Sequence, residues 1–134
     1  MKSGLVALLS TQASITAICS TRIYVTKAPQ KALLPYVIIT QISTEENASL
    51  DGATGQLRFV TFDIDCKAKT SVQSESLGNA VRVFLQDYSG AAGSYTIGAV
   101  LMNDESDGYE PPDDGSDIGV HVVTLDVDIQ YQVT

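Results

Sequence analysis

Two long stretches of alternating apolar and polar residues constrain the fold of this chain more than any other feature. They span residues 57–68 and 120–133. Successive side chains of a strand point to opposite faces, whereas a helix would scatter both sets around its circumference. Each stretch therefore predicts a strand with one apolar face, and both are expected in the middle of one sheet. The apolar faces hold Val60, Phe62, Ile64, Cys66 and Ala68 in the first, and His121, Val123, Leu125, Val127, Ile129, Tyr131 and Val133 in the second.

The polar face of each predicted strand carries an Asp-x-Asp pair, Asp63 with Asp65 and Asp126 with Asp128. If the strands are neighbours, the carboxylates converge, because residues directly opposite each other lie close together. Carboxylates in such a cluster can bind a divalent cation, so a small metal-dependent hydrolase or metal-binding protein is one interpretation. The other is an acidic, hydrated sheet face. No histidine or general base accompanies the four residues, which favours the second interpretation.

The clearest helix pattern covers residues 71–87. Its apolar residues follow the i, i+3, i+4, i+7 spacing of a helix with one buried stripe. We expect this stripe to pack on the apolar face of the sheet. The predicted core therefore joins Leu77, Val81, Phe84 and Leu85 to Phe62, Ile64, Leu125 and Val127, with Ala80 and Tyr88 completing the stripe.

The remaining elements are shorter. A short helix is expected to start near Ser3, and a further turn or two follows a polar break, with Ser14 as a candidate cap. Residues 22–25 are β-prone, residues 36–42 predict an interior strand covered on both faces, and residues 95–102 predict another strand. The chain is expected to form one domain over residues 1–134. Its fold class is α+β, with helices on one face of a mostly antiparallel sheet of four to five strands.

Two polar segments, residues 43–56 and 103–119, are predicted as loops at hairpin tips. The second holds seven acidic residues, two prolines and three glycines. Its spacing does not follow a calcium-binding EF-hand loop. A monomeric binding module with its ligand under residues 104–117 is a further alternative. The acidic residues proposed to dock onto other proteins are Glu45, Glu46 and Asp51 in the first loop, and Asp104, Glu105, Asp107, Glu110, Asp113, Asp114 and Asp117 in the second.

Charge is unevenly distributed along the chain. The net charge is −8, which disfavours a sequence-independent grip on nucleic acid, because that grip requires Lys and Arg to neutralise phosphates. Residues 1–82 hold all 8 basic residues and 6 acidic ones, a sum of +2, whereas residues 83–134 hold 10 acidic and no basic residues. A chain polarised in this way can pack head to tail on copies of itself.

The two cysteines, Cys19 and Cys66, do not suggest a disulfide framework, and both are expected in the core. His121, the only histidine, lies on an apolar face and is expected to be partly buried rather than catalytic. No stretch is long and apolar enough to span a bilayer. The sequence predicts a soluble protein made in the cytoplasm, without a cofactor.

Several strings occur in order along nearly the whole chain. They are Leu5-Val6-Ala7-Leu8-Leu9 in the leading helix, Arg22-Ile23-Tyr24, Ala28-Pro29-Gln30, Leu34-Pro35-Tyr36-Val37-Ile38-Ile39, Ser49-Leu50-Asp51-Gly52 and Ile64-Asp65-Cys66-Lys67-Ala68, followed by a helix and a closing strand. As an ordered set they resemble the tail-completion (tail-terminator) proteins of long-tailed bacteriophages and prophages, although Lys67 stands where the family often has an aromatic residue.

This resemblance implies a structural protein rather than an enzyme. Such proteins form rings, typically hexamers, that cap the tail tube, end its growth and join it to the head. The implied partners are further copies of the chain, the tail tube protein and a head-completion or connector protein, with DNA passing through unbound. The implied location is the head–tail interface of the virion, after synthesis in the host cytoplasm. Asp63, Asp65, Asp126 and Asp128 are then candidates for the channel lining, with the outside of the ring as the competing location.

Overall fold

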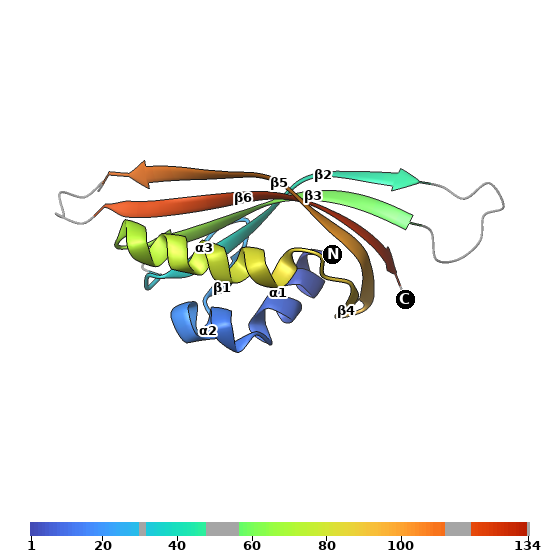
Figure 1. Ribbon diagram of the computed structural model, residues 1–134, viewed down its shortest axis with the longest axis horizontal. Helices are drawn as coiled ribbons and strands as arrows, with labels where there is room; N and C mark the ends of the chain where they lie inside the picture. Colours follow the sequence, from blue (N-terminus) through green and yellow to red (C-terminus); the bar gives the residue numbers. More distant parts are fainter. Residues whose placement is uncertain (30–31, 48–56, 112–118, 134) are drawn as a thin grey trace.

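The computed structural model describes residues 1–29, 32–47, 57–111 and 119–133 (Figure 1). Helices and strands alternate in groups along the chain. In order they are α1 (Lys2–Ser10), α2 (Ala13–Cys19), β1 (Ile23–Val25), β2 (Tyr36–Asn47), β3 (Leu57–Ala68), α3 (Ser71–Leu85), β4 (Gly90–Ala92), β5 (Tyr95–Glu110) and β6 (Val120–Val133).

The two stretches of alternating residues form the central strands β3 and β6, which pair antiparallel. The sheet has six strands in the order β1-β2-β3-β6-β5-β4, against the four to five predicted. β1 runs parallel to β2, and the other described pairs of neighbouring strands are antiparallel. β4 was not predicted from the sequence, because three small residues, Gly90 to Ala92, give no periodic signal.

All three described helices lie on one face of the sheet, as the α+β prediction requires (Figure 1). The short N-terminal helix and the further turn or two predicted after a polar break are α1 and α2, which are separated at Thr11 and Gln12. Ser14 is not a cap, because Gln12 occupies that position without a side-chain hydrogen bond. Within the described ranges, none of the helices combines the length and apolar character needed to cross a membrane.

Helix α3 begins at a conventional cap and ends slightly before the predicted Asp87. The Thr70 hydroxyl accepts a hydrogen bond of 3.1 Å from the backbone N–H of Gln73, which satisfies one of the free donors of the first turn. Gly78 faces the sheet, where a Cβ would lie 2.8 Å from Cγ1 of Val123. A glycine inside a helix lowers its intrinsic stability, and here it lets α3 approach β6 closely.

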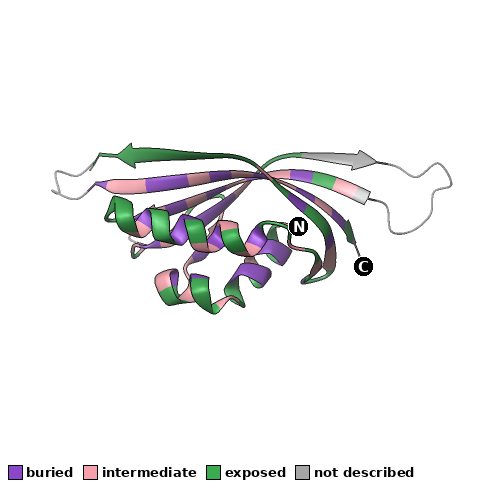
Figure 2. Cartoon of the chain, in the orientation of Figure 1, coloured by how far each residue is buried: buried purple, intermediate pink, exposed green. Residues whose placement is uncertain are grey.

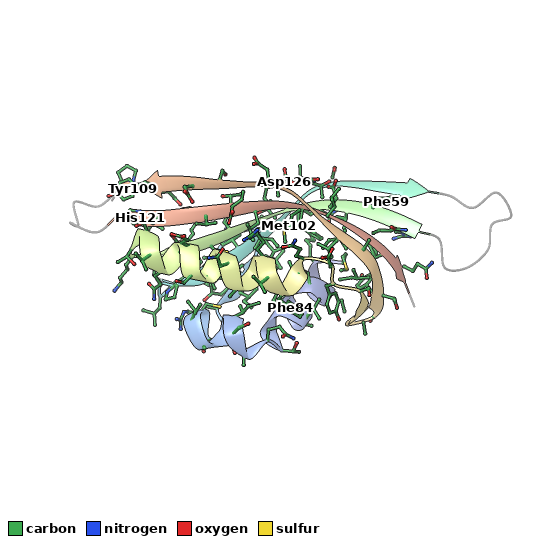
Figure 3. All side chains as sticks on the ribbon, in the orientation of Figure 1. Phe59, Phe84, Met102, Tyr109, His121 and Asp126 are labelled. Atoms are coloured by element: carbon green, nitrogen blue, oxygen red, sulfur yellow. The ribbon has the colours of Figure 1, made fainter. Side chains whose placement is uncertain are left out.

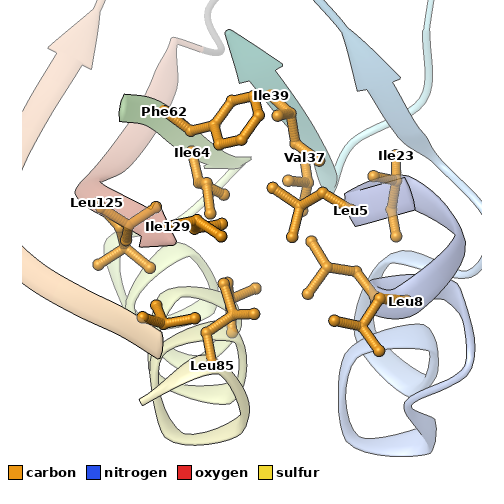
Figure 4. Packing of buried hydrophobic residues seen from close by; sticks show 14 of the residues in the cluster. Leu5, Leu8, Ile23, Val37, Ile39, Phe62, Ile64, Leu85, Leu125 and Ile129 are labelled. Carbon is orange, nitrogen blue, oxygen red and sulfur yellow. The ribbon is translucent and has the colours of Figure 1, made fainter. Parts of the chain in front are cut away.

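The core lies between the sheet and the helices (Figure 4). The predicted residues of β3 and β6 are buried in it, together with Leu77, Val81 and Leu85 of α3. Phe84 departs from the prediction, because it is only partly buried. It lines an open groove that also contains Gln12 and Ser14, so the side of α3 that faces α2 is less tightly covered than the side that faces the sheet.

The long hairpins differ from the predicted loops. β5 continues through residues 103–110, which were expected to be a loop, and β2 continues to Asn47 (Figure 1). β2 was predicted to be covered on both faces over residues 36–42. Its first part is covered in this way, since Val37, Ile38 and Ile39 are buried, but Ile42 is exposed. Figure 1 shows that the far part of the β2–β3 hairpin extends beyond the helices, and Figure 2 shows that the far part of β5 is exposed.

Candidate interaction surface on the open face of the sheet

The face of the sheet opposite the helices, here called the open face, brings the four predicted aspartates onto two neighbouring strands. Asp63 of β3 lies directly opposite Asp126 of β6. Asp65 lies opposite Thr124, and Asp128 lies opposite Thr61. The convergence expected from the alternation is therefore present, with one direct carboxylate pair at its centre.

Two threonines organise the outer carboxylates of this cluster. The Thr61 hydroxyl donates a hydrogen bond of 2.6 Å to Oδ1 of Asp128, and the Thr124 hydroxyl donates one of 2.7 Å to Oδ1 of Asp65. Sequence reasoning missed both threonines, although their place on the same polar alternation was a usable signal. Because each hydroxyl joins β3 to β6, these bonds hold the outer carboxylates in fixed positions.

A third strand extends the acidic row. Asp104 of β5 pairs with Asp126, and Thr40 of β2 pairs with Asp63. One row across the open face therefore reads Thr40, Asp63, Asp126, Asp104. The Asp104 carboxylate also accepts a hydrogen bond of 2.9 Å from the backbone N–H of Glu105. Figure 3 shows Asp126 in this part of the sheet.

The centre of the row is electrostatically unfavourable. Partial burial, followed by the charges of Asp126 and Asp65, raises the pKa of Asp63 above its usual value. Oδ1 of Asp126 is buried and has no hydrogen-bond partner. In the part of the chain that the structure describes, no three His, Cys, Asp or Glu side chains are arranged to hold a metal ion. What the described row presents is a negative surface.

Replacing Asp63 with asparagine should raise the free energy of unfolding at pH 7 by about 0.2–1 kcal/mol, because it removes one of two carboxylates that face each other. The folded protein holds the Asp63 proton more tightly than the unfolded chain does, since its pKa is raised. The wild type therefore gains stability as the pH falls through that raised pKa, and the advantage of the variant should shrink on acidification.

Urea unfolding at several pH values measures this difference. Asp65→Asn is the matched control, because Asp65 faces the Thr124 hydroxyl instead of a carboxylate. The control should show a smaller gain at pH 7 than Asp63→Asn, because the charge of Asp65 acts on Asp63 less than that of Asp126 does. A loss of stability in Asp63→Asn at pH 7 would contradict the repulsion.

An ion pair lies at one end of the open face. Nζ of Lys67 on β3 is 2.7 Å from Oε1 of Glu110 on β5. Burial alone lowers the pKa of Lys67, but the hydrogen bond and the charge of Glu110 outweigh it, so the pKa lies above its usual value. The contact connects two strands across β6 and neutralises one of the acidic residues of β5.

The residues assigned to docking loops occupy several different positions. Asp104, Glu105, Asp107 and Glu110 are exposed residues of β5, so their assignment to a loop was wrong. The alternative of a ligand under residues 104–117 therefore concerns a segment whose first part is strand, and residues 112–118 of it lie outside the described residues. Glu45 and Glu46 belong to β2, while the structure does not describe their side chains; Asp51, Asp113, Asp114 and Asp117 lie outside the described residues.

His121 packs against an aromatic ring near the start of β6. The centroids of the His121 and Tyr109 rings are 4.9 Å apart, and His121 is partly buried, as expected (Figure 3). Both cysteines are buried free thiols, also as expected, and burial raises the pKa of each.

These observations define an α+β protein whose distinctive site is a charged sheet face with long strand edges. The model of the family described as "Tail completion protein gp17" matches residues 3–132. The chain belongs to this family of phage tail structural proteins. The expected membership in the tail-completion family is thus confirmed.

One similar solved structure is that of a "Virion of native gene transfer agent (GTA) particle". The two chains are 12% identical, and the match covers 90% of this chain and 86% of the other with a TM-score of 0.61. At this identity the similarity shows a shared fold. No curated protein sequence matches the chain.

Proposed function

We propose that this protein is a ring-forming subunit that completes the phage tail, ends the growth of the tail tube and joins the tail to the head. The observation that supports this most strongly is the family match over residues 3–132, because it includes every helix and strand except the first residue of α1 and the last of β6. In this proposal residues 1–134 act as one structural domain, and the protein has no catalytic role or cofactor.

The proposed location is the head–tail interface of the virion, after synthesis in the host cytoplasm. The similar solved structure is that of a gene transfer agent virion, which is consistent with this location. The proposed partners are further copies of the chain, the tail tube protein and a head-completion or connector protein. A ring of six subunits is the size that the family resemblance implies.

A ring of this kind leaves a channel for DNA, and the open face of the sheet is the proposed lining. Asp63, Asp65, Asp126 and Asp128 would then face the passing duplex, with Asp104 beside them. Negative side chains repel phosphates and release no counterions on contact, so they give DNA nothing to bind. The lining would let the genome pass without holding it.

Removing the gene from the phage tests the proposed function. Without the protein, tails should grow to irregular lengths and remain unattached to heads, because nothing caps the tube. Electron microscopy of lysates measures both properties, and the wild-type chain supplied in trans is the control that should restore them. Tails of normal length joined to heads in the absence of the protein would overturn the proposal.

A further inference from the structure

The sheet has two open strand edges, one on each side. β4 pairs with β5 only at Tyr95, Thr96 and Ile97, and β1 pairs with β2 only along residues 37–39. Among the described strands, none pairs with β5 along residues 99–110 on the side away from β6, or with β2 along residues 40–47 on the side away from β3. An unpaired edge presents backbone N–H and C=O groups that can pair with another strand.

The two open edges lie at the same level of the sheet. The next row of the open face joins Ser43 of β2 to Leu101 of β5 through Thr61 and Asp128. The row described above likewise runs from Thr40 at one edge to Asp104 at the other. β4 and β1 lie above and below these rows, so neither covers the edges at this level. At this level the open residues are 99–104 of β5 and 40–45 of β2, because residues 105–107 lie level with the part of β2 that β1 covers. Over these residues, a second copy placed beside the first meets an open edge with an open edge.

The strand directions fit such a contact. β2, β3, β6 and β5 are antiparallel in turn, so β5 runs opposite to β2. When two copies stand side by side in the same orientation, β5 of one lies antiparallel to β2 of the next. Antiparallel pairing satisfies the backbone groups of both edges with bonds perpendicular to the strands.

We propose that copies of this protein join head to tail through these edges, with β5 of one subunit adding to β2 of the next. Each edge carries an exposed apolar side chain at the matching level, Leu101 with 62% and Ile42 with 55% of its surface accessible. A contact between copies would bury both. Since β2 and β5 are different surfaces of one subunit, the contact is heterologous and can close into a ring.

One basic residue near the start of the open edge of β2 can face the acidic segment of β5. Glu105 is an exposed acidic residue beside Asp104 on β5. On the other side, the backbone N–H of Thr26 donates a 2.9 Å hydrogen bond to the carbonyl of Ile39, which places the exposed Lys27 where the open edge of β2 begins. Because Thr40 and Asp104 share one row, Lys27 of one copy meets the acidic segment of its neighbour.

This junction rests on the proposed ring and specifies how its subunits connect. It would continue the sheet from subunit to subunit, so the acidic row of the open face would also continue around the assembly. The competing role for the acidic residues of β5 is protection of an edge that never pairs, a common use of charge on edge strands. A test of which edges meet distinguishes these two roles.

Cysteines at the two apolar positions provide that test. In assembled tails carrying Leu101→Cys together with Ile42→Cys, mild oxidation should produce a ladder of disulfide-linked subunits, because only adjacent Cβ atoms can form the bond. Each single substitution should yield monomers, since the junction does not bring two copies of the same position together. Cys19 and Cys66 are buried, so they should not react.

Val72→Cys combined with Ile42→Cys is the matched control, because Val72 is similarly exposed but lies on α3. It should yield no ladder, and circular dichroism should show every variant folded. The number of subunits per tail, measured by mass, separates the two proposals. A ring without a ladder in the Leu101/Ile42 variant overturns the junction alone, whereas a single subunit per tail overturns the ring and the junction together.

Discussion

Replacing Phe62 with alanine should lower the free energy of unfolding by about 3–5 kcal/mol. Phe62 lies in the middle of β3 and is 0% exposed. Its ring packs among the buried residues between the sheet and the helices (Figure 4). Truncation removes apolar contacts and leaves a cavity, because a close-packed interior relaxes only in part.

The other two phenylalanines are internal controls for this measurement. Phe59 lies on the same strand but on the open face, where it is 37% exposed, so Phe59→Ala should cost about 1 kcal/mol or less. Phe84 packs only partly against the core, so its truncation should fall between the two rather than reach the loss expected for a fully buried ring. Chemical denaturation of the three variants gives this ranking. Equal losses at Phe59 and Phe62 would show that the faces of β3 are wrongly assigned.

The sequence predicted the centre of the fold well because its patterns there are strong. β3 and β6 have the predicted bounds, and α3 differs only at its end. In each case one face is apolar over many residues, so burial and periodicity agree. The missed element, β4, lacks such a face, because three residues are too few to show a period.

Residues 103–110 show why the edge of the sheet was harder to predict. This segment of β5 is acidic or polar on both sides and carries no apolar alternation. The segment forms a strand because it pairs with β6, and the buried apolar residues of β6 fix that strand in the sheet. Such tertiary support overrides local preference, which is weak for strands.

The candidate site, like the fold, was predictable at its centre but not at the edge of the sheet. The alternation placed Asp63, Asp65, Asp126 and Asp128 on polar faces, and their convergence followed once the strands were neighbours. Asp104 joins this acidic row only because residues 103–110, which were predicted as a loop, continue β5. Asp65 and Asp128 have threonine partners because of the register in which β3 and β6 pair. That register depends on the whole sheet, so it cannot be predicted from the sequence of one strand.

Replacing Asp63, Asp65, Asp126 and Asp128 together with lysine should slow genome ejection on the order of tenfold or more if the open face lines the channel. Each subunit would then exchange four negative side chains for four positive ones. Phosphates would displace counterions on contact with the lysines, so the duplex would bind to a wall that it now passes. Ejection triggered in purified particles, followed by release of labelled DNA, measures the rate.

The same four positions replaced with asparagine form the matched control. Asparagine keeps a carbonyl oxygen that can accept the hydrogen bonds donated by the hydroxyls of Thr61 and Thr124, but it carries no charge. These particles should eject their DNA much faster than the lysine particles, because a neutral wall gives phosphates no cation to bind. Subunit mass and the number of intact tails must match between both variants, so that folding and ring closure are equal. Normal ejection from the lysine particles would place the open face outside the channel, since a wall of cations facing DNA cannot leave its passage unchanged.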